Sequence, residues 1–204
     1  MAESQRNVLD TFVYEEPRAA LPVWYVEEGL IGQEALLSHF LPGRGAAVAW
    51  RAEAQNGDPK PDTGVPALLL MMDEEALQFP KGFAKDDFVI QGLYAVFNCC
   101  THMCCQPGWQ FLPRERQRAD LGYDTVYCPC HASQYDPRRL EEYKHPGWPR
   151  GEGADYLGIY KVPKVGPANR GMPLIPITLE DGKIVGHLKN PAWYRYQKFR
   201  RKNL

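Results

Sequence analysis

Short apolar runs alternate with polar, proline-rich and glycine-rich stretches from residue 46 onward, and this pattern predicts β-strands joined by turns. Strands are expected over residues 46–53, 65–72, 93–97, 124–127, 174–179 and 183–188. The last two flank Asp181-Gly182, which favours a tight hairpin because both central residues of such a turn need a positive φ. One short helix is expected over residues 33–40. The pattern therefore predicts an all-β domain of antiparallel strands.

The composition is that of an ordinary globular protein. Hydrophobic residues make up 44% of its 204 residues, and 24 Lys and Arg balance 25 Asp and Glu to a net charge of -1. A charge so close to zero gives no general attraction for nucleic acid, so no nucleic-acid partner is expected. No apolar stretch approaches the roughly 18 residues of a transmembrane helix, and acidic residues interrupt the N-terminal segment where a signal peptide needs an apolar core. We therefore expect neither a transmembrane helix nor an export signal in this chain.

The cysteines gather in two short segments, CCTHMCC and CPCHASQYD. All six lie between positions 99 and 130. Each segment offers a cysteine and a nearby histidine, Cys100 with His102 and Cys128 with His131. Two thiolates and two imidazoles can bind a 2Fe-2S cluster, with the thiolates on one iron and the imidazoles on the other. The alternative is a structural zinc site, which takes the same ligands but usually pairs cysteine with cysteine and histidine with histidine.

The two segments resemble the Rieske iron-sulfur proteins, and within them the disulfide-bearing branch of cytochrome bc-type complexes. The family pattern C-T-H-L-G-C is close to CTHMCC, and C-P-C-H-G-S-x-Y-D is close to CPCHASQYD. The resemblance implies a Rieske-type 2Fe-2S cluster, with Cys100 and Cys128 on one iron and His102 and His131 on the other. It also implies an antiparallel sandwich or barrel with a small cluster-binding subdomain, which in this chain carries long inserted loops.

The same resemblance assigns roles to residues around the cluster. Cys105 and Cys130 fall on the disulfide that ties the two loops together. Ser133 falls on the serine that hydrogen-bonds a bridging sulfide, and Tyr135 on the tyrosine that hydrogen-bonds a cysteine sulfur. Donors aimed at sulfur stabilise the reduced, more negative cluster, so both residues are expected to raise its potential.

A proline loop covers the cluster in this family, and the segment Gly166-Pro167-Ala168 resembles that loop. Gly166 and Pro167 are therefore expected to lie against the cofactor.

Some positions depart from the family pattern. Two insertions are expected, one within residues 106–123 and one between residues 136 and 166, and both are expected near the cluster tip. Cys104 and Ala132 stand where the family has glycine, and the alanine is expected to be a mild change. Cys99 and Cys104 are expected to be buried or spare thiols, with a different disulfide pairing as the alternative.

The resemblance implies an electron-transfer subunit rather than an enzyme that turns over alone. It would accept an electron and a proton from quinol at the cluster tip, where His102 and His131 are the catalytic residues, and pass the electron to a cytochrome. The implied partners are cytochrome b and a c-type cytochrome or other membrane-complex subunits, and the implied location is the membrane periphery on the extracytoplasmic face. The alternatives are a small Rieske subunit of a molybdenum oxidoreductase such as arsenite oxidase, and a soluble Rieske ferredoxin for an oxygenase.

Three segments are expected along the chain. Residues 1–45 are expected to form an N-terminal arm or helical extension, and residues 46–190 the Rieske domain, with its cluster-binding part at about 98–168. Residues 191–204 form a tail with five basic residues, four aromatic ones and no acidic one. This tail is expected either to pack on the domain or to contact a membrane surface or a partner subunit, because aromatic and cationic side chains suit the lipid interface.

Overall fold

The computed structural model describes residues 11–15, 28–50, 65–82, 85–103, 105–107, 125–143 and 156–187. Within these ranges the strands are β1 (Phe12–Tyr14), β2 (Arg44–Trp50), β3 (Val65–Met71), β4 (Val89–Ile90), β5 (Leu93–Phe97), β6 (Val126–Cys128), β7 (Ser133–Tyr143), β8 (Tyr156–Lys161), β9 (Met172–Ile175), β10 (Ile177–Glu180) and β11 (Lys183–Gly186). Short 3₁₀ turns complete the regular structure, namely η2 (Glu28–Leu30), η3 (Leu37–His39), η4 (Glu74–Ala76) and η5 (Lys85–Asp87). The strand pairs are antiparallel, which confirms the predicted all-β antiparallel fold.

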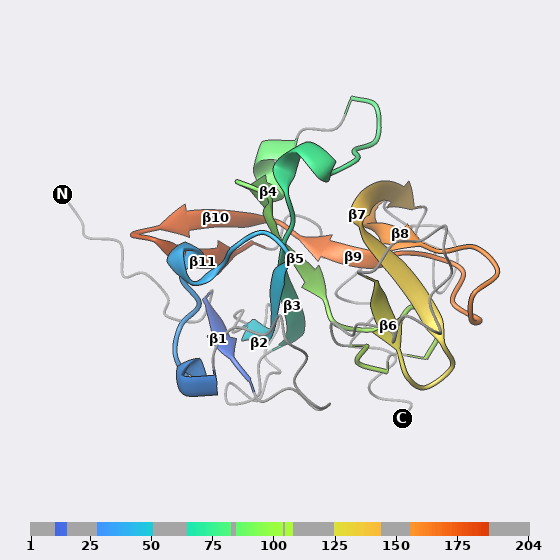
Figure 1. Cartoon of the computed structure of the whole chain (residues 1–204), viewed down its shortest axis with the longest axis horizontal. Helices are drawn as coiled ribbons and strands as arrows, with labels where there is room; N and C mark the ends of the chain where they lie inside the picture. Colours follow the sequence, from blue (N-terminus) through green and yellow to red (C-terminus); the bar gives the residue numbers. More distant parts are fainter. Residues whose placement is uncertain are drawn as a thin grey trace, which may run out of the picture.

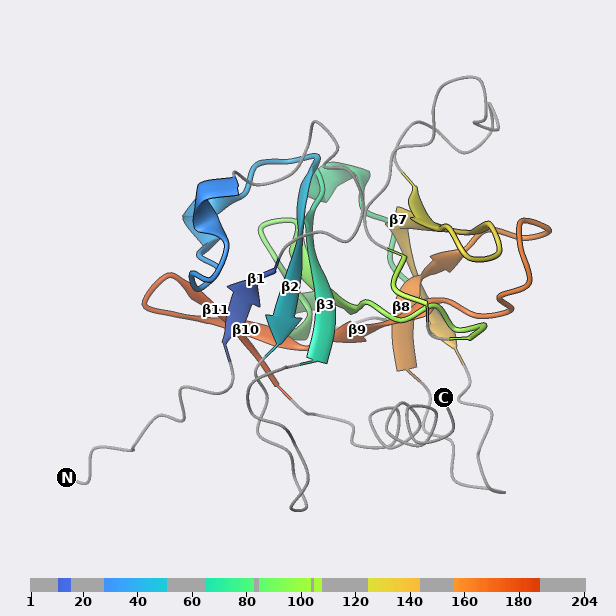
Figure 2. The same ribbon diagram turned by 90° about the horizontal axis from the view of Figure 1, so that it is seen from below.

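One curled sheet runs through the molecule in the order β1-β2-β3-β5-β9-β8-β7-β6, with β4 also paired to β5, while β10 and β11 form a hairpin of their own. Figure 1 shows two halves, a larger one with β1 to β5, β10 and β11, and a smaller one with β6 to β8. Strand β9 joins them, because Leu174 and Ile175 pair with β5 while Met172 and Pro173 pair with β8. The view in Figure 2 likewise places β9 between β3 and β8.

A continuous apolar strand lies at the centre of the larger half. β3 pairs with β2 on one side and β5 on the other, and its Leu68, Leu69 and Leu70 are all 0% exposed. Successive side chains of a strand point to opposite faces, so both faces of β3 are covered. This explains why the strand appears in the sequence as an unbroken hydrophobic run. Each of these leucines contributes roughly 1.5–3 kcal/mol of hydrophobic free energy by its burial.

Most strand predictions are confirmed to within a few residues. Where the structure describes them, the strands expected at 46–53, 65–72, 93–97, 124–127 and 183–188 correspond to β2, β3, β5, β6 and β11, and residues 51–53, 124 and 188 lie outside the described ranges. The strand expected at 174–179 is wrong as a single element, because Pro176 divides it between β9 in the large sheet and β10 in the hairpin. The turn of that hairpin is confirmed, since Asp181 and Gly182 have φ values of 51° and 80°.

The helix predicted over residues 33–40 is wrong, and the segment forms only the single 3₁₀ turn η3. Its backbone N–H groups bond to distant strands instead of to the preceding turn. The N–H of Ala35 donates to the carbonyl of Phe12 at 2.8 Å, and that of Leu37 donates to the carbonyl of Gly182 at 3.0 Å. Those donors are therefore not available for helical hydrogen bonds. Hydrogen bonds to distant segments therefore outweigh the helical tendency that the local spacing of apolar residues suggested.

Several expectations concern residues outside the described ranges. The tail at 191–204 and most of the insertion at 106–123 lie there, so their placement stays a prediction. The other insertion is described in part, where it lengthens β7 and β8 up to the pair Tyr143 and Tyr156. β1 comes from the expected N-terminal arm and pairs with β2, while the domain boundaries stay predictions. No helix among the described residues has both the length and the hydropathy needed to cross a membrane.

A bulge in β7 anchors the smaller half to the larger one. The pairing of β7 with β8 shifts register after Asp136, which frees the next residues for other partners. The N–H of Gln78, which follows η4, donates to the carbonyl of Arg138 at 2.8 Å. The fully buried hydroxyl of Tyr94 on β5 donates to the carbonyl of Pro137. Pro137 suits this position, since a bulge does not require the N–H that proline lacks.

We predict that Tyr94→Phe lowers the free energy of unfolding by about 1–3 kcal/mol, because it leaves the buried Pro137 carbonyl without its donor. Urea unfolding followed by circular dichroism measures the loss. Tyr160→Phe is the matched control on β8, because its ring is half-buried and packs under Arg139, and it should change the free energy by less than about 0.5 kcal/mol. Equal losses in the two variants would contradict a specific role for the Tyr94 hydroxyl.

Candidate metal centre

Two loops carry the Cys-His segments. The first follows β5, and the second forms the turn of the β6–β7 hairpin. In the hairpin Cys128 is paired with Ser133, and the N–H of Ala132 donates to the carbonyl of Cys128 at 2.9 Å. In the first loop the N–H of Cys100 donates to the carbonyl of Cys105 at 2.8 Å. Backbone hydrogen bonds therefore close both loops.

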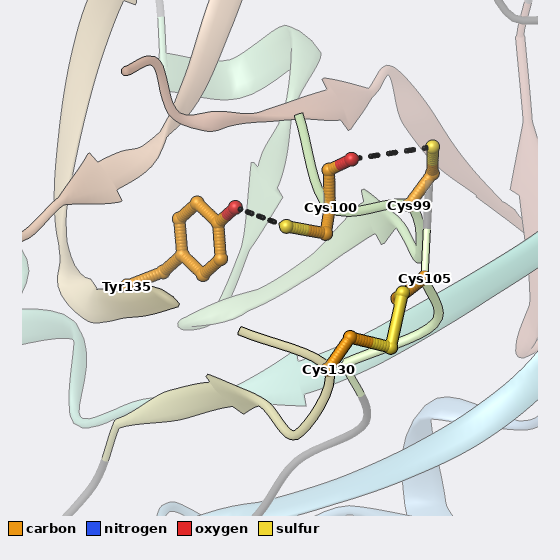
Figure 3. The surroundings of a disulfide bond; sticks show 5 residues. All are labelled: Cys99, Cys100, Cys105, Cys130 and Tyr135. Atoms are coloured by element: carbon orange, nitrogen blue, oxygen red, sulfur yellow. Dashed lines mark hydrogen bonds between the residues drawn. A yellow bond between two sulfur atoms is a disulfide. The ribbon is translucent and has the colours of Figure 1, made fainter. Parts of the chain in front are cut away.

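A disulfide joins the two loops. Cys105 of the first loop is bonded to Cys130 of the second, with their Cα atoms 6.5 Å apart (Figure 3). This is the pair that the Rieske resemblance implies, and the bond limits how far the loops can separate. The sulfur of Cys128 lies within 4.8 Å of both disulfide sulfurs. Because those two sulfurs are already bonded to each other, the thiol of Cys128 is the group in this trio that can bind a metal ion.

Cys100 and Cys128 are the free cysteines of the described residues, and both are buried. Interaction with the Cys128 side chain, assisted by the hydroxyls of Tyr135 and Ser133, lowers the pKa of the Cys100 thiol to about 5, although burial acts in the opposite direction. The same interaction raises the pKa of Cys128. The surroundings of Cys100 therefore favour the thiolate, which is the form that binds metal ions.

Strand β7 supplies two hydroxyl groups to this thiolate. The Tyr135 oxygen lies 3.1 Å from the Cys100 sulfur, and Figure 3 shows the ring pointing at it. Tyr135 is fully buried, and burial raises its pKa, so the hydroxyl stays protonated and donates. Ser133, also fully buried, accepts a hydrogen bond from the N–H of Ala168 at 3.1 Å. Its own proton is then available to Cys100.

The two histidines lie in contact with each other. The ring centroids of His102 and His131 are 4.8 Å apart, and their planes are 89° apart. His131 is exposed, and so is Met103 in the other loop, whereas His102 is half-buried with its Nδ1 atom buried. A buried ring nitrogen suits a metal ligand, and an exposed ring suits contact with a partner molecule.

The donor set fits a 2Fe-2S cluster with mixed ligands. Such a cluster needs two thiolates for one iron and two imidazoles for the other. Each loop carries one free, buried cysteine, and the rings of His102 and His131 are in contact, so each loop offers one thiol and one imidazole to such a cluster.

A third loop packs against the second Cys-His loop. Gly166 has a φ of 68°, and a Cβ at this position would lie 2.4 Å from the backbone nitrogen of Ser133. Glycine is therefore required by both the backbone conformation and the space. Ala168 in the same loop is buried, whereas Pro167 is exposed. The structure thus brings Gly166 beside the hairpin turn that carries His131.

Two expectations about the cysteine loops need correction. Cys99 is buried but disulfide-bonded, so it is not a spare thiol, and Cys104 lies outside the described residues. Ala132 has a φ of 61°, in the left-handed region. Alanine in place of glycine is therefore more than a mild change, since that conformation costs an L-residue roughly 1–2 kcal/mol. The hairpin turn holds a strained residue directly next to His131.

Sequence reasoning missed a role for Thr101. Its hydroxyl donates to the carbonyl of Arg170 at 2.6 Å and ties the first loop to the segment that leads into β9. The side chain is 7% exposed. The available signal was the position of Thr101 between a cysteine and a histidine of one motif. Its acceptor is a backbone carbonyl far along the chain, so the sequence does not indicate this contact.

Comparison with known proteins finds a distant similarity to a Rieske iron-sulfur subunit. No protein-family model matches this chain. Among curated proteins it is similar to the cytochrome bc1 complex Rieske iron-sulfur subunit of Corynebacterium diphtheriae, with 27% identity over 119 residues. The matched stretch is 58% of this chain and 22% of the length of that relative. The similarity is distant, and it agrees with the disulfide and the paired cysteines described above.

We predict that Gly166→Ala destabilises the protein more than Gly182→Ala does. The φ values are 68° and 80°, so both variants carry a similar conformational cost of about 1 kcal/mol. A Cβ at Gly166 also clashes with the Ser133 backbone, whereas at Gly182 nothing lies within 4 Å. The expected loss for Gly166→Ala is therefore above about 2 kcal/mol, measured by urea unfolding. Losses of the same size at both positions would show that the close approach is not important.

Proposed function

We propose that this protein is a Rieske-type 2Fe-2S electron-transfer subunit. The observation that carries the proposal is the pair of free, buried thiols, Cys100 and Cys128, on two loops that a disulfide joins. The distant similarity to a Rieske iron-sulfur subunit supports it independently of the geometry. The bound cluster would supply one-electron redox chemistry.

The chain's own residues have separate tasks in this proposal. Cys100 and Cys128 would hold one iron, and His102 and His131 the other. Tyr135 donates to a ligand sulfur from a fully buried position, and such donors favour the more negative state of the cofactor. The disulfide between the loops keeps the ligands from separating.

The finer proposal is that the electron comes from quinol and goes to a c-type cytochrome in a bc-type complex, beside cytochrome b. His131 and Met103 are exposed, so a partner can reach the ring of one proposed ligand. The curated relative is a subunit of a cytochrome bc1 complex, which favours this role over a soluble carrier. A disulfide persists in oxidising compartments, and this supports a location at the membrane periphery on the extracytoplasmic face.

The purified protein is expected to contain about two irons and two acid-labile sulfides per chain, with visible absorption and the electron paramagnetic resonance signal of a reduced 2Fe-2S cluster. His131→Ala should lose the cluster because it removes a ligand. His187→Ala is the matched control, since this histidine hydrogen-bonds to Thr178 at 2.6 Å on the separate hairpin. Metal analysis that finds one zinc and no iron in the wild-type protein would overturn the proposal.

The midpoint potential is expected above 0 mV at neutral pH, inside the Rieske range of about -150 to +300 mV. Tyr135→Phe should lower the potential by about 65 mV. This figure converts the loss of a hydrogen bond worth about 1.5 kcal/mol at about 59 mV per tenfold change in a one-electron equilibrium. Tyr160→Phe on β8 should leave it unchanged. A redox titration measures all three proteins. A wild-type potential well below 0 mV would favour a soluble ferredoxin and contradict quinol oxidation.

A further inference from the structure

Lys161 is a buried charged residue next to the candidate centre. It ends β8, is 7% exposed and lies directly opposite Tyr135 in the β7–β8 pairing. Residues directly opposite each other in an antiparallel pair project from the same face. The Tyr135 side chain projects toward the sulfur of Cys100, so the Lys161 side chain leaves its strand on the side of the proposed ligand.

Neutral groups hold the ammonium of Lys161. Its Nζ donates to the carbonyl of Val162 at 2.5 Å and to that of Val165 at 2.8 Å. These hydrogen bonds satisfy two of its three donors, but a carbonyl carries no net charge. Among the residues that the structure describes, none of the ion pairs includes Lys161.

A buried cation is costly unless a negative charge compensates it. Burial lowers the pKa of Lys161, whereas Cys100 acts in the opposite direction. Because Lys161 lies opposite Tyr135, the negative charge of a cluster at the centre would compensate the buried ammonium.

We propose that Lys161 is a buried positive charge that favours the reduced state of the cluster, an inference that rests on the function proposed above. Reduction adds one negative charge to the centre, and a nearby cation stabilises that charge more than it stabilises the oxidised state. Ser133 and Tyr135 act through hydrogen bonds to sulfur, whereas Lys161 acts through its charge. The residue is a tuning residue and not a ligand.

The test is the midpoint potential of Lys161→Gln, measured by redox titration of the iron-loaded protein at fixed pH and salt. A unit charge on the order of 10 Å away, at an effective dielectric constant of about 20, changes a one-electron equilibrium by about tenfold. We therefore expect the reduction equilibrium to fall about tenfold, which is about 59 mV. Lys161→Arg keeps the charge and should restore most of the potential.

Two further variants separate charge from structure. Lys161 hydrogen-bonds to the carbonyl of Val165, and Val165→Ala loosens that loop without changing any charge. The midpoint potential of this variant should therefore match that of the wild type. Lys183→Gln removes an exposed lysine of the separate hairpin, paired with Glu34, and should also have no effect. An unchanged potential in Lys161→Gln, or an equal fall in Val165→Ala, would overturn the proposal.

Loss of the cluster in a variant is also decisive. If Lys161→Gln binds no iron while Lys161→Arg does, the charge is needed to form the centre rather than to set its potential, and the proposal is overturned. If neither variant binds iron, Lys161 is a structural residue of the loop, and the tuning role is wrong. A wild-type protein without iron would overturn the proposed function itself, which is a different result from any of these.

Discussion

The burial of two free cysteine side chains is the constraint on which the rest of the candidate centre depends. A buried sulfur that carries negative charge needs donors around it, and the Tyr135 hydroxyl lies 3.1 Å from the Cys100 sulfur, with Ser133 on the same strand. Ser133 and Tyr135 are two residues apart on β7, so they project from one face of the strand. A strand can therefore place both donors without help from a flexible loop.

The larger half of the molecule holds this arrangement in place. The bulge of β7 bonds to Tyr94 and Gln78, both from the larger half, so the strand that carries the donors is fixed at its middle. The disulfide fixes the loop ends, and Gly166 lets a third loop pack directly on the Ser133 backbone. The strained conformation of Ala132 persists because the surrounding contacts determine the turn.

The sequence was sufficient where a feature depends on local chemistry. The Asp181-Gly182 turn and the apolar run of β3 belong to this class, and the ligand role of the Cys-His motifs stays a prediction. It was insufficient where distant segments decide the outcome. Residues 33–40 form strand-type bonds with partners far along the chain. The role of Lys161 depends on its place opposite Tyr135, and a single lysine in an apolar strand does not indicate that register.

The arrangement separates the residues that tune the centre from those that a partner would touch. Tyr135, Ser133 and Lys161 are buried on β7 and β8, whereas His131 and Met103 lie exposed on the loops. A buried donor or charge acts in a region of low dielectric constant, where its effect on the potential is large. An exposed side chain acts through water and affects the potential less. Substitution of an exposed loop residue that is not a proposed ligand, such as Met103, would therefore change which partner binds while the potential stays under the control of the strands.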